Sequence, residues 1–129
     1  MPFHVVFEVG GVRAAVPAAD VLEVVAVRDA VPVPGAPPFV AGLLGHRGAV
    51  VPLVDGAERV TGVPAPAGRA TLALLVGTSL GTIGITADRV IDLEDADVTR
   101  GRRIDVELLV RECRQRLAPY CSVRPEEPA

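Results

Sequence analysis

The sequence predicts a mostly β protein that ends in one α-helix. Valine occurs 23 times in 129 residues, and this β-branched residue suits the half-buried surface of a sheet. The chain also contains 13 Gly and 12 Pro, which interrupt it at the short intervals typical of turns between strands. One segment near the C-terminus has helical periodicity instead. A chain of this length is expected to form a single domain.

The N-terminal part is expected to consist of strands joined by tight turns. Gly10-Gly11 is a two-residue hairpin signal, because both central positions of a type I′ turn have positive φ. Residues 17–20 form a turn or a single helical turn, and prolines fix residues 31–38 as an extended connection. The strands expected here are residues 3–9, 11–16 and 21–27.

The middle of the chain is expected to alternate short strands with one helical turn. Gly45-His46-Arg47-Gly48 is a tight turn between residues 39–44 and a strand at 49–54. Pro52 lacks an N–H, so it predicts that this strand lies at an edge or carries a bulge. Asp55 is the expected N-cap of a helical turn. Further extended segments are expected at residues 70–76, 80–87 and 89–93.

The C-terminal region is expected to contain the helix. Asp105 caps residues 106–118, and Pro119 ends the helix. The apolar residues of this segment recur at helical spacing, so they form one stripe that should pack on the sheet. The stripe consists of Val106, Leu109, Val110, Cys113 and Leu117. We expect one domain over residues 1–123 and a flexible tail over 124–129.

The composition excludes several classes of function. A net charge of −3 and 3% aromatic residues are unlike a nucleic-acid-binding protein, which usually has a basic field and stacking platforms. All 13 basic residues are Arg, so no lysine-dependent chemistry is available. No apolar run approaches the about 18 residues that span a bilayer, and no signal peptide is visible. We expect a cytoplasmic protein without metal or cofactor, whose Cys113 and Cys121 stay reduced.

Two motifs suggest catalysis or cation binding but are incomplete. Residues 77–81 match the G-x-S-x-G nucleophile elbow, which requires a helix after Ser79 and a later histidine. A β-like segment follows instead, and no histidine occurs after His46, so we interpret the match as a hairpin turn. The acidic residues near position 95 lack the calcium-loop pattern and are interpreted as a solvated loop. They are Asp92, Glu94, Asp95 and Asp97.

Glu23 and Arg47 are lone charges within otherwise apolar stretches. A charge on the solvent face of a half-buried strand is ordinary. Two opposite charges beside exposed valines would instead form a partner-binding site. His46 next to Arg47 could also serve as an acid/base pair, although no nucleophile or carboxylate lies near it in the sequence.

The order of these residues resembles the CheW-like domain family, the adaptors of bacterial chemosensory arrays. The V-x-E strand at residues 21–23 is followed, over residues 34–55, by P-x-x-P-x-F-h-x-G-h-h-x-x-R-G-x-h-h-P-h-h-D, where h is apolar. Residues 84–93 resemble the family's G-h-h-h-D-x-V-x-x-h, and residues 104–109 its closing h-D-h-x-x-L. The resemblance covers the chain from about Phe3 to Leu109.

The resemblance implies a fold of two small five-stranded barrels packed on each other, and a function without catalysis. Family members bind the cytoplasmic tips of chemoreceptors in a groove between the barrels, and they also bind the regulatory domain of a histidine kinase. By position, Glu23 and Arg47 match the charged pair of the functional surface, and three valines match groove-lining positions. The expected partner-binding residues are Val21, Glu23, Val24, His46, Arg47, Gly48 and Val90.

The chain departs from the family pattern in two places. The usual N-L-R-G turn reads Gly45-His46-Arg47-Gly48. Residues 95–103 are too few for the family's additional hairpin, because a strand needs about five residues plus its turn. The second barrel should therefore be truncated, as in the short Frz-type homologues of myxobacteria. We expect receptor binding with weak or absent kinase coupling.

Four alternatives remain open from the sequence. The chain could be an ordinary coupling protein that links receptor and kinase, or it could pair with another CheW-like protein. A small-barrel oligomerisation module without a receptor partner is the third. An enzyme that uses the Gly77–Gly84 segment or His46 and Arg47 is the least favoured, because no catalytic constellation is complete.

Overall fold

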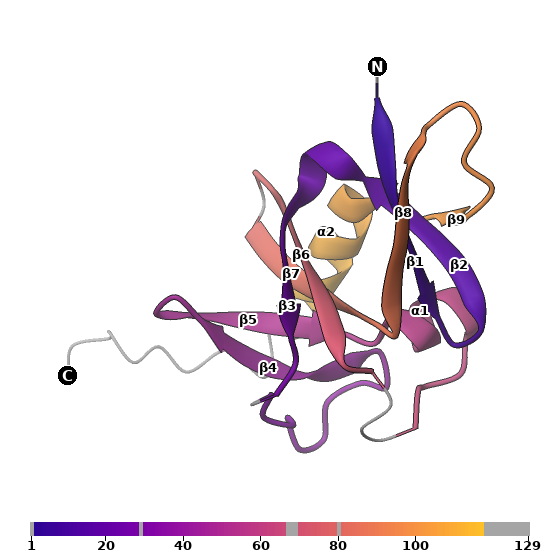
Figure 1. The fold of residues 1–129 in the computed structure, drawn as a ribbon. Helices are drawn as coiled ribbons and strands as arrows, with labels where there is room; N and C mark the ends of the chain where they lie inside the picture. The colour runs from indigo at the N-terminus through magenta and orange to yellow at the C-terminus, as the bar shows by residue number, and fades with distance from the viewer. Residues whose placement is uncertain (1, 29, 67–69, 80, 118–129) are drawn as a thin grey trace.

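The computed structural model describes residues 2–28, 30–66, 70–79 and 81–117 (Figure 1). Cys121, the expected tail at 124–129 and the predicted end of the domain at residue 123 lie outside these residues. The strands are β1 Phe3–Val9, β2 Val12–Pro17, β3 Val21–Ala26, β4 Val40–His46, β5 Ala49–Val54, β6 Leu72–Thr78, β7 Gly81–Ala87, β8 Arg89–Asp95 and β9 Arg102–Arg103. The helices are the 3₁₀ turn η1 Ala18–Asp20, α1 Gly56–Thr61 and α2 Val106–Leu117.

The strands form two sheets, which confirms the predicted mostly β fold with two packed barrel-like units and a C-terminal helix. One sheet has the order β3-β6-β7-β5-β4, and the other has the order β8-β1-β2-β9. The four-stranded sheet is the truncated unit, and it combines the first two strands with the last two. Its fourth strand, β9, pairs only with Ala14 and Ala15 of β2. A two-residue strand therefore takes the place where the sequence predicts that a full hairpin cannot fit.

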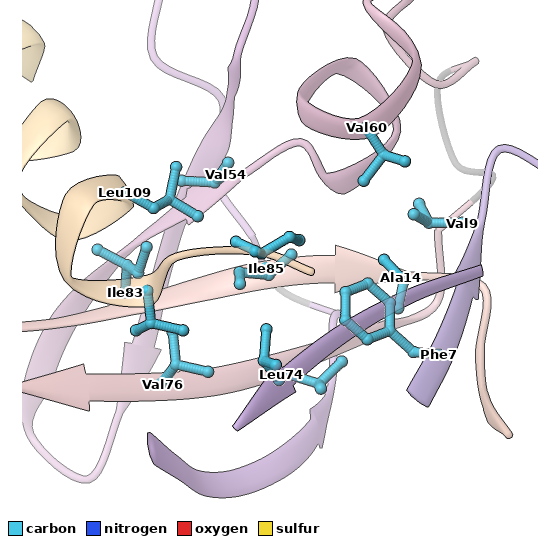
Figure 2. Packing of buried hydrophobic residues seen from close by; sticks show 14 of the residues in the cluster. Phe7, Val9, Ala14, Val54, Val60, Leu74, Val76, Ile83, Ile85 and Leu109 are labelled. Atoms are coloured by element: carbon cyan, nitrogen blue, oxygen red, sulfur yellow. The ribbon is translucent and has the colours of Figure 1, made fainter. Parts of the chain in front are cut away.

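The β6–β7 hairpin carries buried side chains on both of its faces. Leu74 and Ile85 point into the large core between the two sheets, whereas Ala73 and Leu75 point into the interior of the five-stranded barrel. Figure 2 shows side chains from β1, β6, β7 and α2 meeting in the core between the sheets. The two sheets are therefore joined through this hairpin.

Helix α2 packs its predicted stripe into the core between the sheets. Val106, Leu109, Val110 and Cys113 are all buried, as expected, and Asp105 Oδ1 accepts a hydrogen bond from the backbone N–H of Leu108 at 3.0 Å. The helix is described to Leu117, and the side chain of that residue and Ala118 lie outside the description. The expected cap and the first four positions of the stripe are confirmed.

The five-stranded sheet curls until its two edge strands, β3 and β4, come close to each other. The chain that leaves β3 forms an isolated bridge with β4, in which Val31 and Leu43 exchange two backbone hydrogen bonds of 2.8 Å. Gly42 permits this approach, because a Cβ on it would lie 2.7 Å from the carbonyl oxygen of Val31. We call this line of contact between β3 and β4 the barrel seam.

Helix α1 begins as the sequence predicts. The side chain of Asp55 accepts hydrogen bonds from the backbone N–H groups of Glu58 and Ala65, each at 3.1 Å, so it holds both the helix and the loop that follows. An ion pair of 2.7 Å between Arg59 and Glu112 then connects α1 with α2.

Some boundaries and one strand position differ from the sequence prediction. The strand expected at 39–44 extends to His46, and Glu94 and Asp95 belong to β8 instead of a loop. β5 is an inner strand, so the edge position predicted from Pro52 is wrong, whereas the alternative, a bulge, occurs in the β4–β5 ladder between Val40 and Gly42 of β4. The proline is tolerated because its partner on β4, Leu43, uses its backbone N–H and carbonyl for hydrogen bonds with Val31. The nitrogen of Pro52 therefore points away from β4. Pro52 also precedes the residues of β5 that pair with β7.

Leu109→Ala should reduce the free energy of unfolding by about 2–5 kcal/mol, because it removes a fully buried side chain and leaves a cavity. The measurement is chemical denaturation followed by circular dichroism. Leu108→Ala is the matched control, because Leu108 is next to Leu109 on the same helix but is 41% exposed. Its truncation should change the free energy of unfolding by about 0.5 kcal/mol or less. Equal effects of the two substitutions would contradict the packing of α2.

Candidate functional site

The three charged or ionisable side chains predicted for the site form one cluster at the barrel seam. Glu23 lies on β3, His46 ends β4, and Arg47 occupies the turn that follows. Arg47 Nη2 lies 3.0 Å from Glu23 Oε1, and His46 Nε2 lies 3.5 Å from the same oxygen. We call these residues the seam cluster. It joins the two edge strands at the end opposite the Val31–Leu43 bridge.

The strand register explains why these side chains meet. Glu23 is opposite Leu75, which points into the barrel interior, and directly opposite residues of paired strands share a face. His46 is two residues after Leu44, which also points into the interior, so it shares that face as well. Both side chains therefore extend from the interior face at the open end of the barrel.

Arg47 is held in an unusual backbone conformation. His46 and Ala49 pair across the turn, so Arg47 and Gly48 are its central residues, with φ angles of 51° and 80°. Positive φ at both positions defines a type I′ turn, in which Asn-Gly is the preferred sequence. A left-handed conformation costs most residues about 1–2 kcal/mol. Among the described residues, Arg47 alone combines a side chain with positive φ, and this strain points to a role for its guanidinium.

The predicted valines lie on the other face of β3 or on the other sheet. Val21 and Val24 are opposite Val76 and Leu74, which belong to the core between the sheets. Val90, on β8, is opposite Phe7 of the same core. Val24 is 43% exposed and Val90 is 39% exposed, so both border this core without being covered by it. We call the exposed side chains of Val24 and Val90 the valine surface.

The predicted site is therefore divided by β3. A bulge between Val21 and Glu23 sets the register, after which Glu23 and Val24 alternate to opposite faces of the strand. Glu23 and Val24 are neighbours in sequence but face different sides of the strand. A partner that uses both the seam cluster and the valine surface must contact both faces of β3.

Two exposed apolar side chains near the candidate site were not predicted. Leu22 lies at the bulge beside Gly77 of β6, on the face of β3 that carries Glu23, whereas Leu93 is opposite Val5 on the face of β8 that carries Val90 and extends the valine surface. Strand alternation does not place Leu22, because the bulge between Val21 and Glu23 interrupts it. No sequence signal identifies Leu93, because a second bulge at Ile91 changes its alternation with Val90.

An exposed ion pair lies next to Val90. The Arg89 guanidinium donates hydrogen bonds to both carboxylate oxygens of Glu8, at 3.2 and 3.4 Å. This hydrogen bonding, with the attraction of the guanidinium charge, lowers the pKa of Glu8 and raises the pKa of Arg89. The pair fixes the start of β8 against β1, and it keeps a charge at the border of the valine surface.

The other chemical motifs have local structural roles. Thr78 pairs with Gly81, so the G-x-S-x-G match is the turn of the β6–β7 hairpin; Leu80 itself lies outside the described residues. In the acidic segment, Asp92 and Asp95 accept hydrogen bonds from the backbone of Leu93 and Asp97. In the described part of the chain, no three His, Cys, Asp or Glu side chains are arranged to hold a metal ion, and no helix is long and apolar enough to cross a membrane.

Comparison with known proteins shows which family has this architecture. A sequence model of the CheW-like domain matches residues 4–106. The chain belongs to the CheW-like domain family. The resemblance identified in the sequence is therefore confirmed, and the seam cluster and all the valine positions lie within the matched region of this CheW-like chain.

One curated relative and one solved structure illustrate the likeness. Protein FrzA of Myxococcus xanthus is 36% identical over 87 residues, which are 67% of this chain and 54% of FrzA. The crystal structure of the scaffolding protein TtCheW from Thermoanaerobacter tengcongensis superposes with a TM-score of 0.63 at 24% identity, over 75% of this chain and 65% of TtCheW. The match thus spans about half of FrzA and somewhat less than two thirds of TtCheW, and the second comparison shows a shared fold.

Arg47→Asn should leave the free energy of unfolding within about 1 kcal/mol of the parent. Asparagine adopts positive φ more easily than arginine, and this gain offsets the loss of an exposed ion pair, which contributes about 0–1 kcal/mol. Thermal and urea denaturation measure the effect. A loss of more than about 2 kcal/mol would show that the guanidinium is needed for folding and is not a group reserved for a partner.

Proposed function

We propose that this CheW-like protein is a non-enzymatic adaptor of a bacterial chemosensory system that binds the cytoplasmic tip of a chemoreceptor. The observation that carries this proposal is the strained Arg47, whose side chain is 76% exposed and is held against Glu23 at the barrel seam. Family membership supports the adaptor role. The absence of a histidine after Ser79 and of any lysine supports a function without catalysis.

The surface around β3 suits a helical partner. Exposed apolar side chains on β3 and β8 offer sites for the apolar residues of a helix, and the seam cluster offers a charged contact beside them. Binding energy in such interfaces concentrates in a few residues, among which arginine is frequent. A guanidinium has more donors than Glu23 occupies, so Arg47 retains donors for an acidic group on the receptor.

The truncated sheet is the reason to propose weak or absent kinase coupling. Residues 96–105 connect β8 to α2 and contribute only the two-residue strand β9 to the four-stranded sheet. A stable interface buries about 800 Å² on each partner, and a shortened sheet presents less surface for a second protein. The seam cluster and the valine surface lie outside this connection, so receptor binding does not depend on it.

Arg47→Glu should weaken binding to a purified receptor signalling-tip fragment at least tenfold, because it places two carboxylates side by side in the seam cluster. Isothermal titration calorimetry measures the affinity. Arg111→Glu is the matched control: Arg111 forms an exposed ion pair with Glu107 on α2, away from β3, at 3.7 Å. Unchanged receptor binding by a folded Arg47→Glu variant would contradict the proposed role of the seam cluster.

A second binding experiment compares the two partners of the family. The purified protein should bind the receptor fragment, and it should bind the regulatory domain of the histidine kinase at least tenfold more weakly. Analytical ultracentrifugation of each mixture gives the stoichiometry. Tight, stoichiometric kinase binding with kinase activation would make the protein an ordinary coupling protein, whereas self-association without either partner would identify an oligomerisation module.

A further inference from the structure

Glu23 has two basic neighbours, an arginine and a histidine. Arg47 Nη2 and His46 Nε2 approach the same carboxylate oxygen, at 3.0 and 3.5 Å. Arginine stays charged at all physiological pH values, whereas histidine ordinarily gains or loses its proton between pH 5 and 8. The His46 side chain is 23% exposed, so protons reach it from solvent while it stays beside Glu23.

Glu23 and Arg47 are the charged groups close enough to respond to a change in the charge of His46. The residue opposite His46 on β5 is Ala49, and the nearest interior side chains of β4 and β6 on the same face are Leu44 and Leu75. Within the described residues, Glu23 is the one acidic group within ion-pair distance of the imidazole. Glu23 and Arg47 are also the other charged members of the seam cluster.

Protonation of His46 changes the net charge of the seam cluster. With a neutral imidazole, the Glu23 carboxylate balances the Arg47 guanidinium, and the seam cluster has no net charge. With a protonated imidazole, one carboxylate is shared by two cations and the seam cluster carries one positive charge. Arg47 is then less fully neutralised by Glu23, and its exposed guanidinium attracts an acidic group more strongly.

We propose that His46 makes partner binding by the seam cluster respond to pH, so that a partner with an acidic residue against Arg47 binds more tightly as the pH falls from about 7.5 to 5.5. This inference rests on the proposed adaptor function and adds a regulation of the same site. It also assigns a role to the histidine that replaces a residue of the usual family turn.

The first experiment needs no partner. Nuclear magnetic resonance of the isolated protein follows the His46 ring, the Arg47 side-chain Nε–H and the Glu23 carboxyl carbon between pH 5 and 8. The Arg47 and Glu23 signals should shift with the same midpoint as the His46 ring, and these shifts should disappear in His46→Gln. Arg47 and Glu23 signals that stay constant through the titration of the ring would overturn the proposal.

The second experiment measures binding to the receptor signalling-tip fragment at pH 7.5 and 5.5. The affinity of the parent protein for the fragment should rise about two- to fivefold at the lower pH, which is the effect of one exposed charge pair. The affinity of His46→Gln for the same fragment should not show this rise. His46→Arg carries a permanent charge and should bind with similar affinity at both pH values, in line with the parent at pH 5.5.

The two experiments separate failure of this inference from failure of the proposed function. Equal pH dependence of the parent and His46→Gln, with binding intact, would overturn the inference and leave the adaptor function standing. No binding to the receptor fragment at either pH would contradict the adaptor function, while the resonance experiment would still decide whether His46 controls the charge of the seam cluster.

Discussion

The double-sided burial of the β6–β7 hairpin is the constraint on which the rest of the structure depends. Alternate residues of β6 enter two different cores, Leu74 in the core between the sheets and Leu75 in the barrel interior. Neither core is complete without this hairpin, so each sheet is positioned relative to the other through it. Helix α2 and strand β1 then cover the same face of the hairpin, with Leu109 and Phe7 fully buried. The edges of this shared core are where the exposed valines of β3 and β8 lie.

Closure of the five-stranded barrel produces the charged part of the candidate site. Strands β3 and β4 are not hydrogen-bonded to each other, and the barrel seam is held at one end by the Val31–Leu43 bridge. At the other end, Glu23 contacts Arg47, so the side chains that close the barrel there remain partly exposed to solvent. An exposed ion pair contributes little to stability. Folding stability therefore gives little reason for the positive φ of Arg47, and the proposed partner contact offers one.

The truncated sheet has an exposed edge strand that is protected against unwanted pairing. β8 carries four charged side chains among its seven residues, and a bulge at Ile91 interrupts its regular ladder. Charges and bulges are two devices by which natural sheets discourage edge-to-edge association. The opposite edge is covered by β9, which pairs with β2, while Arg102 donates a hydrogen bond to the carbonyl oxygen of Val60 in α1. The charges and the bulge at one edge, and β9 at the other, thus limit the pairing of the truncated sheet with further strands.

The sequence by itself determined the features that depend on neighbouring residues. The Gly10-Gly11 turn, the Asp55 and Asp105 caps and the first four positions of the apolar stripe of α2 are set by nearby residues, and all appear as predicted. The family pattern also predicted the candidate site residues and a truncated second sheet, and the structure confirms the truncated sheet. Only the tertiary structure decided which of these residues meet. Glu23 and Arg47 are 24 positions apart and come together because barrel closure places the two edge strands side by side. Glu23 and Val24 are adjacent, yet the pleat of β3 directs them to opposite faces, and bulges, which carry no simple sequence signal, set where each face points.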